Sequence, residues 1–155
     1  MKTPIKITIC LIMPTGVSEV SFADPLEDAI KARRSFYQVV SFNAGGLFGM
    51  AKGDIAYDAK QAQAYADNLK ALSQLQNGPM WPKGSDNVAM KGKTRARPEA
   101  WTEYPVVKEK SAAWKAAIAD LAGVAGTGLE PLRSKIGALG DSCKGCHEKI
   151  RAKDF

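Results

Sequence analysis

Residues 129–150 read LEPLRSKIGALGDSCKGCHEKI, a segment whose apolar positions recur at alternating spacings of three and four residues. Those positions are Leu129, Leu132, Ile136, Leu139, Cys143, Cys146 and Ile150. Because an α-helix turns once every 3.6 residues, this spacing predicts one amphipathic helix with a single apolar face. Two cysteines stand where the pattern calls for buried side chains, so a group bonded to them is expected to lie in the protein interior.

Cys143, Cys146 and His147 form a C-x-x-C-H motif within this segment. Thiols three residues apart can add to the two vinyl groups of a porphyrin, and the adjacent imidazole is then placed to bind the iron. His147 is the only histidine of the chain, and the only further cysteine is Cys10. The motif therefore predicts one covalently attached haem c, with His147 as the protein ligand of its iron.

Other uses of the motif require residues that the sequence does not provide. A structural zinc site needs about four ligands, usually as two separated pairs, whereas the chain has one such pair and one histidine. A thioredoxin-like redox pair belongs in a β-α-β setting, and no strand pattern surrounds the motif. A disulfide between Cys143 and Cys146 would close a very short loop within a helix and contribute little stability.

Residues 1–23 are predicted to be an export signal that is removed. Two lysines precede an apolar run at residues 7–17, and the small residues Ser21 and Ala23 stand before the cleavage point. The apolar run is too short to span a bilayer. Since c-type haem is attached outside the bacterial cytoplasm, export agrees with the motif. The chain is expected to be periplasmic, with no membrane span and with residues 24–155 forming one haem-binding domain.

The chain is basic, with 22 lysine and arginine residues, 16 acidic residues and a formal net charge of +6. Four of the basic residues, Lys91, Lys93, Arg95 and Arg97, lie close together in a segment that contains glycine and proline and little aromatic character. Export removes the opportunity to bind nucleic acid, so no nucleic-acid partner is expected. The cluster predicts either a solvated loop or a docking patch for an acidic periplasmic redox partner protein.

Three further segments show helical periodicity, and none shows the alternation of strands. The first starts after Asp24, with proline at its first position, and ends near Ala51. The second runs from Asp58 to about Asn77, and the third ends before Gly126. The expected inward positions are Ile30, Arg33, Tyr37, Val40, Ala44 and Leu47 in the first, Ala62, Tyr65, Leu69 and Leu72 in the second, and Val107, Ser111, Trp114, Ile118, Leu121 and Ala125 in the third.

Residues 78–102 are rich in glycine, proline and lysine and are predicted to form a long loop between the second and third helices. Four helices joined in this way predict an all-α protein, an antiparallel four-helix bundle that holds the haem in its core. The alternative architecture is the small domain of the mitochondrial type of cytochrome c. That class has its C-x-x-C-H motif near the N-terminus, whereas His147 lies eight residues from the C-terminus here.

Four parts of the sequence carry a resemblance to a known family. They are the C-x-x-C-H motif followed by Arg151, the AIKARR segment at residues 29–34, and the loop segments WPKGS and TRARPEAW at residues 81–85 and 94–101. Together they resemble cytochrome c′, the periplasmic four-helix-bundle haem protein of bacteria, and the likeness extends over residues 24–155. The resemblance implies a five-coordinate, high-spin haem that binds nitric oxide or carbon monoxide, carries single electrons, or does both. It also implies a homodimer formed through the first two helices.

The resemblance assigns roles to individual residues. Tyr37 matches the bulky residue that blocks the sixth coordination position of the iron, and Arg33 matches a residue near a haem propionate. Arg151 matches the basic residue that flanks the proximal histidine. Apart from the resemblance, Trp81 is a candidate for the lining of the pocket.

Each of these residues has a second interpretation that the sequence leaves open. Arg33 can pack its stem on the edge of the bundle and keep its charge in solvent. Tyr37 can be an ordinary core residue, Trp81 a packing residue, and Arg151 a solvent-exposed arginine near a helix C-terminus. If the register of the first helix is shifted by one, Phe36 takes the place of Tyr37.

A methionine ligand would give the iron a different electronic state. The candidates are Met50, Met80 and Met90. Met50 follows Tyr37 by thirteen residues, so it is expected on another face of the helix, about 20 Å along the axis. The other two lie in the long loop, and their ligation is the alternative: a low-spin, six-coordinate electron-transfer cytochrome. The chain is not expected to be an enzyme, because it has no second histidine to act as a distal acid–base group.

Overall fold

The computed structural model describes residues 24–155, and the predicted export signal at residues 1–23 lies outside the described part. The four long helices are α1 (Pro25–Lys52), α2 (Ala59–Ser73), α4 (Tyr104–Ala122) and α5 (Leu129–Ile150). Two short elements, the 3₁₀ turn η1 (Gly78–Met80) and the helix α3 (Glu99–Thr102), lie in the connection between α2 and α4.

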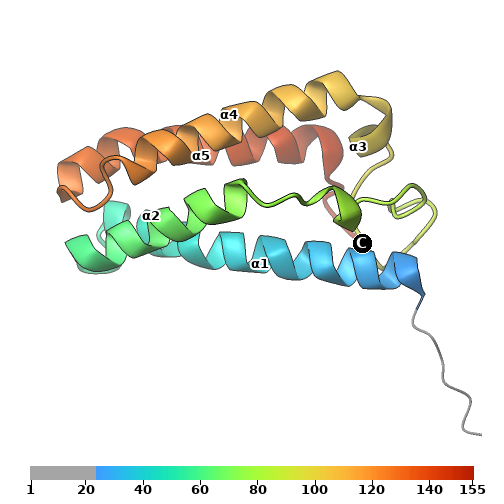
Figure 1. The fold of residues 1–155 in the computed structure, drawn as a ribbon, viewed down its shortest axis with the longest axis horizontal. Helices are drawn as coiled ribbons and strands as arrows, with labels where there is room; N and C mark the ends of the chain where they lie inside the picture. Colours follow the sequence, from blue (N-terminus) through green and yellow to red (C-terminus); the bar gives the residue numbers. More distant parts are fainter. Residues whose placement is uncertain (1–23) are drawn as a thin grey trace, which may run out of the picture.

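The long helices form an antiparallel bundle (Figure 1). α1 packs against α2 and α5, and α4 packs against the same two helices. Within residues 24–155 the only strand-like pairing is an isolated bridge between Ala96 and Arg151. These findings confirm the predicted all-α bundle with its long connection between the second and third long helices. No helix in this part of the chain is both long enough and apolar enough to cross a lipid bilayer.

The ends of α1 follow from local sequence. The Asp24 side chain accepts a hydrogen bond from the Leu26 N–H at 2.9 Å, which satisfies a backbone donor that has no partner within the helix. At the other end Gly53 adopts the left-handed conformation, with φ of 88°, and its N–H donates to the Gly49 carbonyl at 3.0 Å. The predicted start is confirmed, and the helix extends one residue beyond the predicted end.

The densest part of the core lies between the C-terminal half of α1, the N-terminal half of α5, and α2 and α4. Its large side chains with almost no accessible surface are Leu47, Met50, Leu69, Ile118, Leu121, Leu132 and Leu139. On α5 the buried positions are Leu132, Ile136 and Leu139, whereas Cys143 and Cys146 are half-buried. The predicted apolar face of α5 is present, and the motif lies just beyond the densely packed core.

One predicted core position is wrong by one residue. On α1 the buried residue is Phe36, with 7% of its surface accessible, whereas Tyr37 is 42% accessible. On α2 Tyr65 packs against the core as predicted, next to the fully buried Ala66. A period of 3.6 residues does not choose between the i+3 and i+4 positions, so the neighbouring helices decide which side chain is enclosed.

The connection between α2 and α4 begins earlier than predicted, because α2 ends at Ser73. Backbone hydrogen bonds hold this connection against the C-terminal tail. The Arg97 N–H donates to the Ile150 carbonyl at 2.8 Å, and the Ala152 N–H donates to the Arg95 carbonyl at 2.8 Å. The loop is therefore fixed at the end of the bundle where α5 ends.

Candidate haem-binding site

The C-x-x-C-H motif occupies the last two turns of α5. Cys143 and Cys146 are both free thiols, so the structure contradicts a disulfide between them. Because helix residues at i, i+3 and i+4 share one side, α5 presents both thiols and the His147 imidazole together. This is the arrangement that attachment of a single porphyrin requires.

The protonation states of the three side chains suit a haem. Burial raises the pKa of the Cys143 and Cys146 thiols above the ordinary value, which keeps both as S–H groups. Burial, together with the positive charge of Arg95, lowers the pKa of His147 and favours the neutral imidazole that can bind iron. Across residues 24–155, no group of three or more His, Cys, Asp or Glu side chains is arranged to hold a bare metal ion. The donor set therefore fits a porphyrin held by two thioether bonds.

Tyr37 of α1 faces the thiols of α5. Burial raises the pKa of its phenol to about 12, with the nearby Cys146 and Cys143 adding to the rise and Arg33 opposing it. With 42% of its surface accessible, the residue lies at the border between the bundle and solvent, close to the two cysteines. The ring packs edge-on against Phe36 with 5.0 Å between centroids. Phe36 thus lies on the core side, and Tyr37 on the side of the motif.

Arg33 lies one turn before Tyr37, and only 3% of its surface is accessible. Its Nη1 donates to the Met80 carbonyl at 3.2 Å and to Ser85 Oγ at 3.1 Å. Its Nη2 donates to the Ser85 carbonyl at 2.8 Å and to Thr94 Oγ1 at 2.9 Å. The loop encloses the guanidinium group of Arg33. The interpretation in which Arg33 keeps its charge in solvent is therefore wrong. These bonds use every N–H of the two terminal nitrogens and leave the Nε–H group for a further acceptor.

Trp81 connects Arg33 to Tyr37. The guanidinium carbon of Arg33 lies 4.4 Å from the centroid of the Trp81 ring, a cation–π contact. The Tyr37 ring meets Trp81 edge-on with 6.4 Å between centroids. The Trp81 carbonyl accepts a hydrogen bond from Trp101 Nε1 at 3.0 Å, which anchors the loop further. The structure therefore brings together three of the four candidate residues outside the motif, Arg33, Tyr37 and Trp81.

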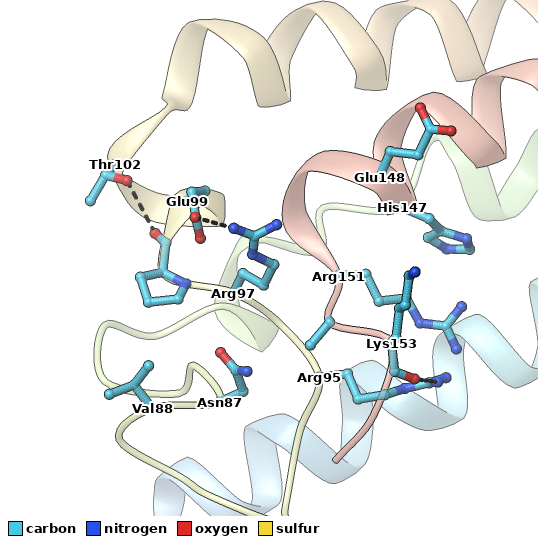
Figure 2. Close-up of a pocket in the computed structure, with 12 residues that line it drawn as sticks. Asn87, Val88, Arg95, Arg97, Glu99, Thr102, His147, Glu148, Arg151 and Lys153 are labelled. Atoms are coloured by element: carbon cyan, nitrogen blue, oxygen red, sulfur yellow. Dashed lines mark hydrogen bonds and ion pairs between the residues drawn. The ribbon is translucent and has the colours of Figure 1, made fainter.

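Arg151, the fourth of these residues, is exposed and lines an open cleft of about 1090 Å³ together with His147 (Figure 2). The other charged residues of the lining are Arg95, Arg97, Glu99, Glu148 and Lys153. Neither motif cysteine lines the cleft, nor does Tyr37. The cleft is therefore a second surface, which shares only His147 with the motif.

The candidate methionines have different surroundings. Met50 is 1% accessible and belongs to the core at the C-terminal end of α1. Met80 packs against the edge of the core, and its carbonyl accepts a hydrogen bond from Arg33. Met90 is half-buried in the loop. Met50 is therefore enclosed in the core. Met80 is the candidate iron ligand that lies next to Arg33.

Two polar residues of the site do not emerge from sequence reasoning. Ser85 and Thr94 have 0% and 3% of their surfaces accessible, and both accept hydrogen bonds from Arg33. They lie in the two loop segments that carry the family resemblance, at residues 81–85 and 94–101, and this is the signal that points to them.

Comparison with protein families decides the affiliation of the chain. Residues 28–151 match the family described as Cytochrome C′. The chain belongs to the cytochrome c′ family. As a member of it, the chain carries covalently attached haem c. The resemblance seen in the sequence is confirmed.

Known cytochromes c′ match this chain over most of their length. That of Alcaligenes xylosoxydans xylosoxydans is 36% identical over 135 residues, which cover 85% of this chain and 98% of that protein. The structure of cytochrome c′ from Rhodobacter Spheriodes has a TM-score of 0.81 at 33% identity, covering 84% of this chain and 99% of that chain.

Three further structures of this family bear on ligands and assembly. A variant of the Alcaligenes xylosoxidans protein in complex with nitric oxide has a TM-score of 0.72 at 34% identity, covering 86% of this chain and 100% of that chain. Another variant of the same protein has bound carbon monoxide. A cytochrome c′ with ligand-controlled dimer dissociation has a TM-score of 0.75 at 30% identity, covering 86% of this chain and 100% of that chain.

Proposed function

We propose that the chain is a periplasmic haem protein whose iron is five-coordinate and high-spin and which binds nitric oxide or carbon monoxide. The observation that carries this proposal is the position of Tyr37, which faces Cys143 and Cys146 from the opposite helix. With His147 as the iron ligand, Tyr37 is the side chain of α1 that takes the place of a second ligand. Its pKa of about 12 keeps the phenol neutral at physiological pH, and a neutral phenol is a poor iron ligand.

The remaining roles follow from the same geometry. When bound, the haem supplies an iron atom that takes diatomic gases and changes between the ferric and ferrous states. Cys143 and Cys146 hold it through thioether bonds. Arg33 has its Nε–H group available for a propionate, and Trp81 keeps Arg33 and Tyr37 in place.

Gas binding is supported by the relatives that were solved with nitric oxide and carbon monoxide. In this chain the Tyr37 ring is packed against Phe36 and Trp81, so a ligand larger than a diatomic must displace a packed ring. The arrangement therefore selects small ligands by size.

Single-electron transfer with periplasmic partner proteins is the second candidate function. The observation that favours it is the open, basic cleft that reaches His147 from the solvent. We assign no catalytic activity, in line with the family as a whole, which is in general periplasmic.

We further propose a homodimer that forms through α1 and α2. Phe42 and Val39 of α1 are 70% and 49% accessible, and the Phe42 ring lies 5.9 Å from that of Tyr65 on α2. Exposed apolar side chains grouped in this way are typical of an interface. Phe42→Glu should shift the protein from dimer to monomer in analytical ultracentrifugation, whereas Leu75→Glu, at another exposed apolar residue, should not. A monomeric wild-type protein would contradict the dimer.

Absorption and electron paramagnetic resonance spectra of the purified ferric and ferrous protein test the coordination state. We expect high-spin ferric signals and a ferrous spectrum without sharp, split visible bands. Split bands with a weak far-red ferric band would instead show methionine ligation, the low-spin alternative, by Met80 or Met90.

Acid–acetone extraction tests covalent attachment: haem should stay with the wild-type protein and be lost from the Cys143→Ala, Cys146→Ala double variant.

A further inference from the structure

We propose that the cleft beside His147 is the docking surface for an acidic electron-transfer protein. This inference rests on the proposed function, because it names the class of redox partner and the place where that partner approaches the haem. His147 lines the cleft directly, so a protein seated there lies next to the side chain that we assign as the iron ligand.

Cationic side chains from two chain segments meet in the cleft (Figure 2). Arg95 and Arg97 come from the loop between α2 and α4, and Arg151 and Lys153 come from the tail that follows α5. The two segments are fixed to one another, because Arg95 Nη1 donates to the Lys153 carbonyl at 3.0 Å in addition to the backbone pairing. The two backbone segments that carry the four cations are therefore held side by side.

Most of this charge is not neutralised within the protein. Arg97 pairs with Glu99 at 2.5 Å, and Glu148 lies 3.9 Å from Lys144. The ion pairs found in residues 24–155 involve none of the other three cations, Arg95, Arg151 and Lys153. Unpaired cations in a concave surface attract an acidic partner and accelerate its association.

The structure also divides the basic cluster that the sequence shows in the loop. Lys93 pairs with Glu27 of α1 at 3.1 Å, and neither Lys91 nor Lys93 lines the cleft. Only the second half of the cluster, Arg95 and Arg97, contributes to the docking surface.

Two features favour a protein over a small inorganic anion. The cleft is open and has a volume of about 1090 Å³, far more than one small anion fills. Val88 lies in the lining and is 75% accessible, which offers an apolar contact of the kind found in protein interfaces.

Stopped-flow reduction of the ferric holoprotein tests the proposal, with a reduced plant-type [2Fe–2S] ferredoxin as the acidic probe. The test variant is Arg97→Gln, Lys153→Gln. The control is Lys52→Gln, Lys60→Gln, which removes the same charge at the junction of α1 and α2, at the opposite end of the bundle (Figure 1). At low ionic strength the test variant should react roughly tenfold more slowly than wild type and with a weaker salt dependence. The control should react at close to the wild-type rate, and all three proteins should have the same absorption spectrum and midpoint potential.

Several results would overturn the docking surface. Equal losses in both variants would mean that only net charge matters, and no loss in either would place docking elsewhere. A changed spectrum or potential in the test variant would make the cleft part of the haem environment. Inhibition by inorganic phosphate at constant ionic strength would assign the cleft to small anions. A low-spin wild-type spectrum would overturn the proposed coordination state instead, and the comparison of rates would still report on docking.

Discussion

Arg33 Nη2 donates a hydrogen bond to the Ser85 carbonyl at 2.8 Å and ties α1 to a distant part of the chain. Arg33 Nη1 donates to the Ser85 hydroxyl at 3.1 Å, so one loop residue receives two bonds from the same guanidinium group. Trp81 lies over that group at 4.4 Å and also packs against Tyr37. The contact that fixes the loop therefore also positions the residue that we propose to cover the iron.

Arg33→Ala should lower the free energy of unfolding by about 2–4 kcal/mol, because several buried acceptors lose their donor and each orphaned group costs about 1–3 kcal/mol. Urea unfolding followed by circular dichroism measures the loss, and limited proteolysis should show faster cleavage between α2 and α4. Arg34→Ala is the matched control, since Arg34 is exposed and its removal should change stability by less than about 0.5 kcal/mol. Similar losses in both variants would contradict the role assigned to Arg33.

Tyr37→Ala should raise the affinity of the ferrous protein for carbon monoxide and admit imidazole to the ferric protein. Since Tyr37 is 42% accessible, its stability cost should be smaller than that of Phe36→Ala, which removes a buried ring and should cost about 3–5 kcal/mol. Carbon monoxide titration and thermal unfolding of both variants separate access to the iron from packing.

The same pair of variants can refute this assignment. A rise in carbon monoxide affinity in Phe36→Ala alone would show that Phe36 covers the iron. If neither variant changes the affinity, the residue that controls access lies elsewhere, with Trp81 as the next candidate, because it packs against Tyr37.

Gly46→Ala should destabilise the protein, because a Cβ atom at this position would collide with the ring of Tyr65 on α2. The neighbouring Gly45→Ala is the control, because its added methyl group would have no atom within 4 Å apart from its chain neighbours and the backbone of its own helix. The gain in helix propensity should stabilise the fold by about 0.5–1 kcal/mol. Opposite signs are expected in thermal unfolding. Stabilisation by both substitutions would show that α1 and α2 do not depend on close approach at Gly46.

The phenol of Tyr37 should titrate above its ordinary pKa of 10.0, because burial disfavours the charged phenolate. The folded protein holds this proton more tightly than the unfolded chain does, so the group stabilises the fold below about pH 10. That contribution is lost as the pH rises from about 10 to 12. Ultraviolet difference titration of tyrosinate should show a late transition that Tyr37→Phe removes. The exposed Tyr104, 67% accessible, serves as the control, and Tyr104→Phe should leave the late transition in place.

Several features could be predicted from the sequence because they depend on local rules. The spacing from Leu129 to Ile150 predicts the helix that the structure shows as α5, and helix geometry then presents Cys143, Cys146 and His147 on one side. The ends of α1 follow from Asp24 and the glycine after Lys52. These features depend on residues that lie within a few helical turns of one another, so they can be predicted without knowing any contact between distant segments.

Tertiary structure alone decided the surroundings of these residues. Periodicity leaves Phe36 and Tyr37 equivalent, and only packing against the other helices encloses one ring and turns the other toward the motif. The burial of Arg33 depends on Ser85 and Thr94, which approach it only when the loop folds back over α1. The basic cleft likewise exists only where the loop meets the tail beyond α5. Sequence periodicity determines which side of a helix is apolar, whereas the partner of each side chain depends on contacts between segments far apart in the chain.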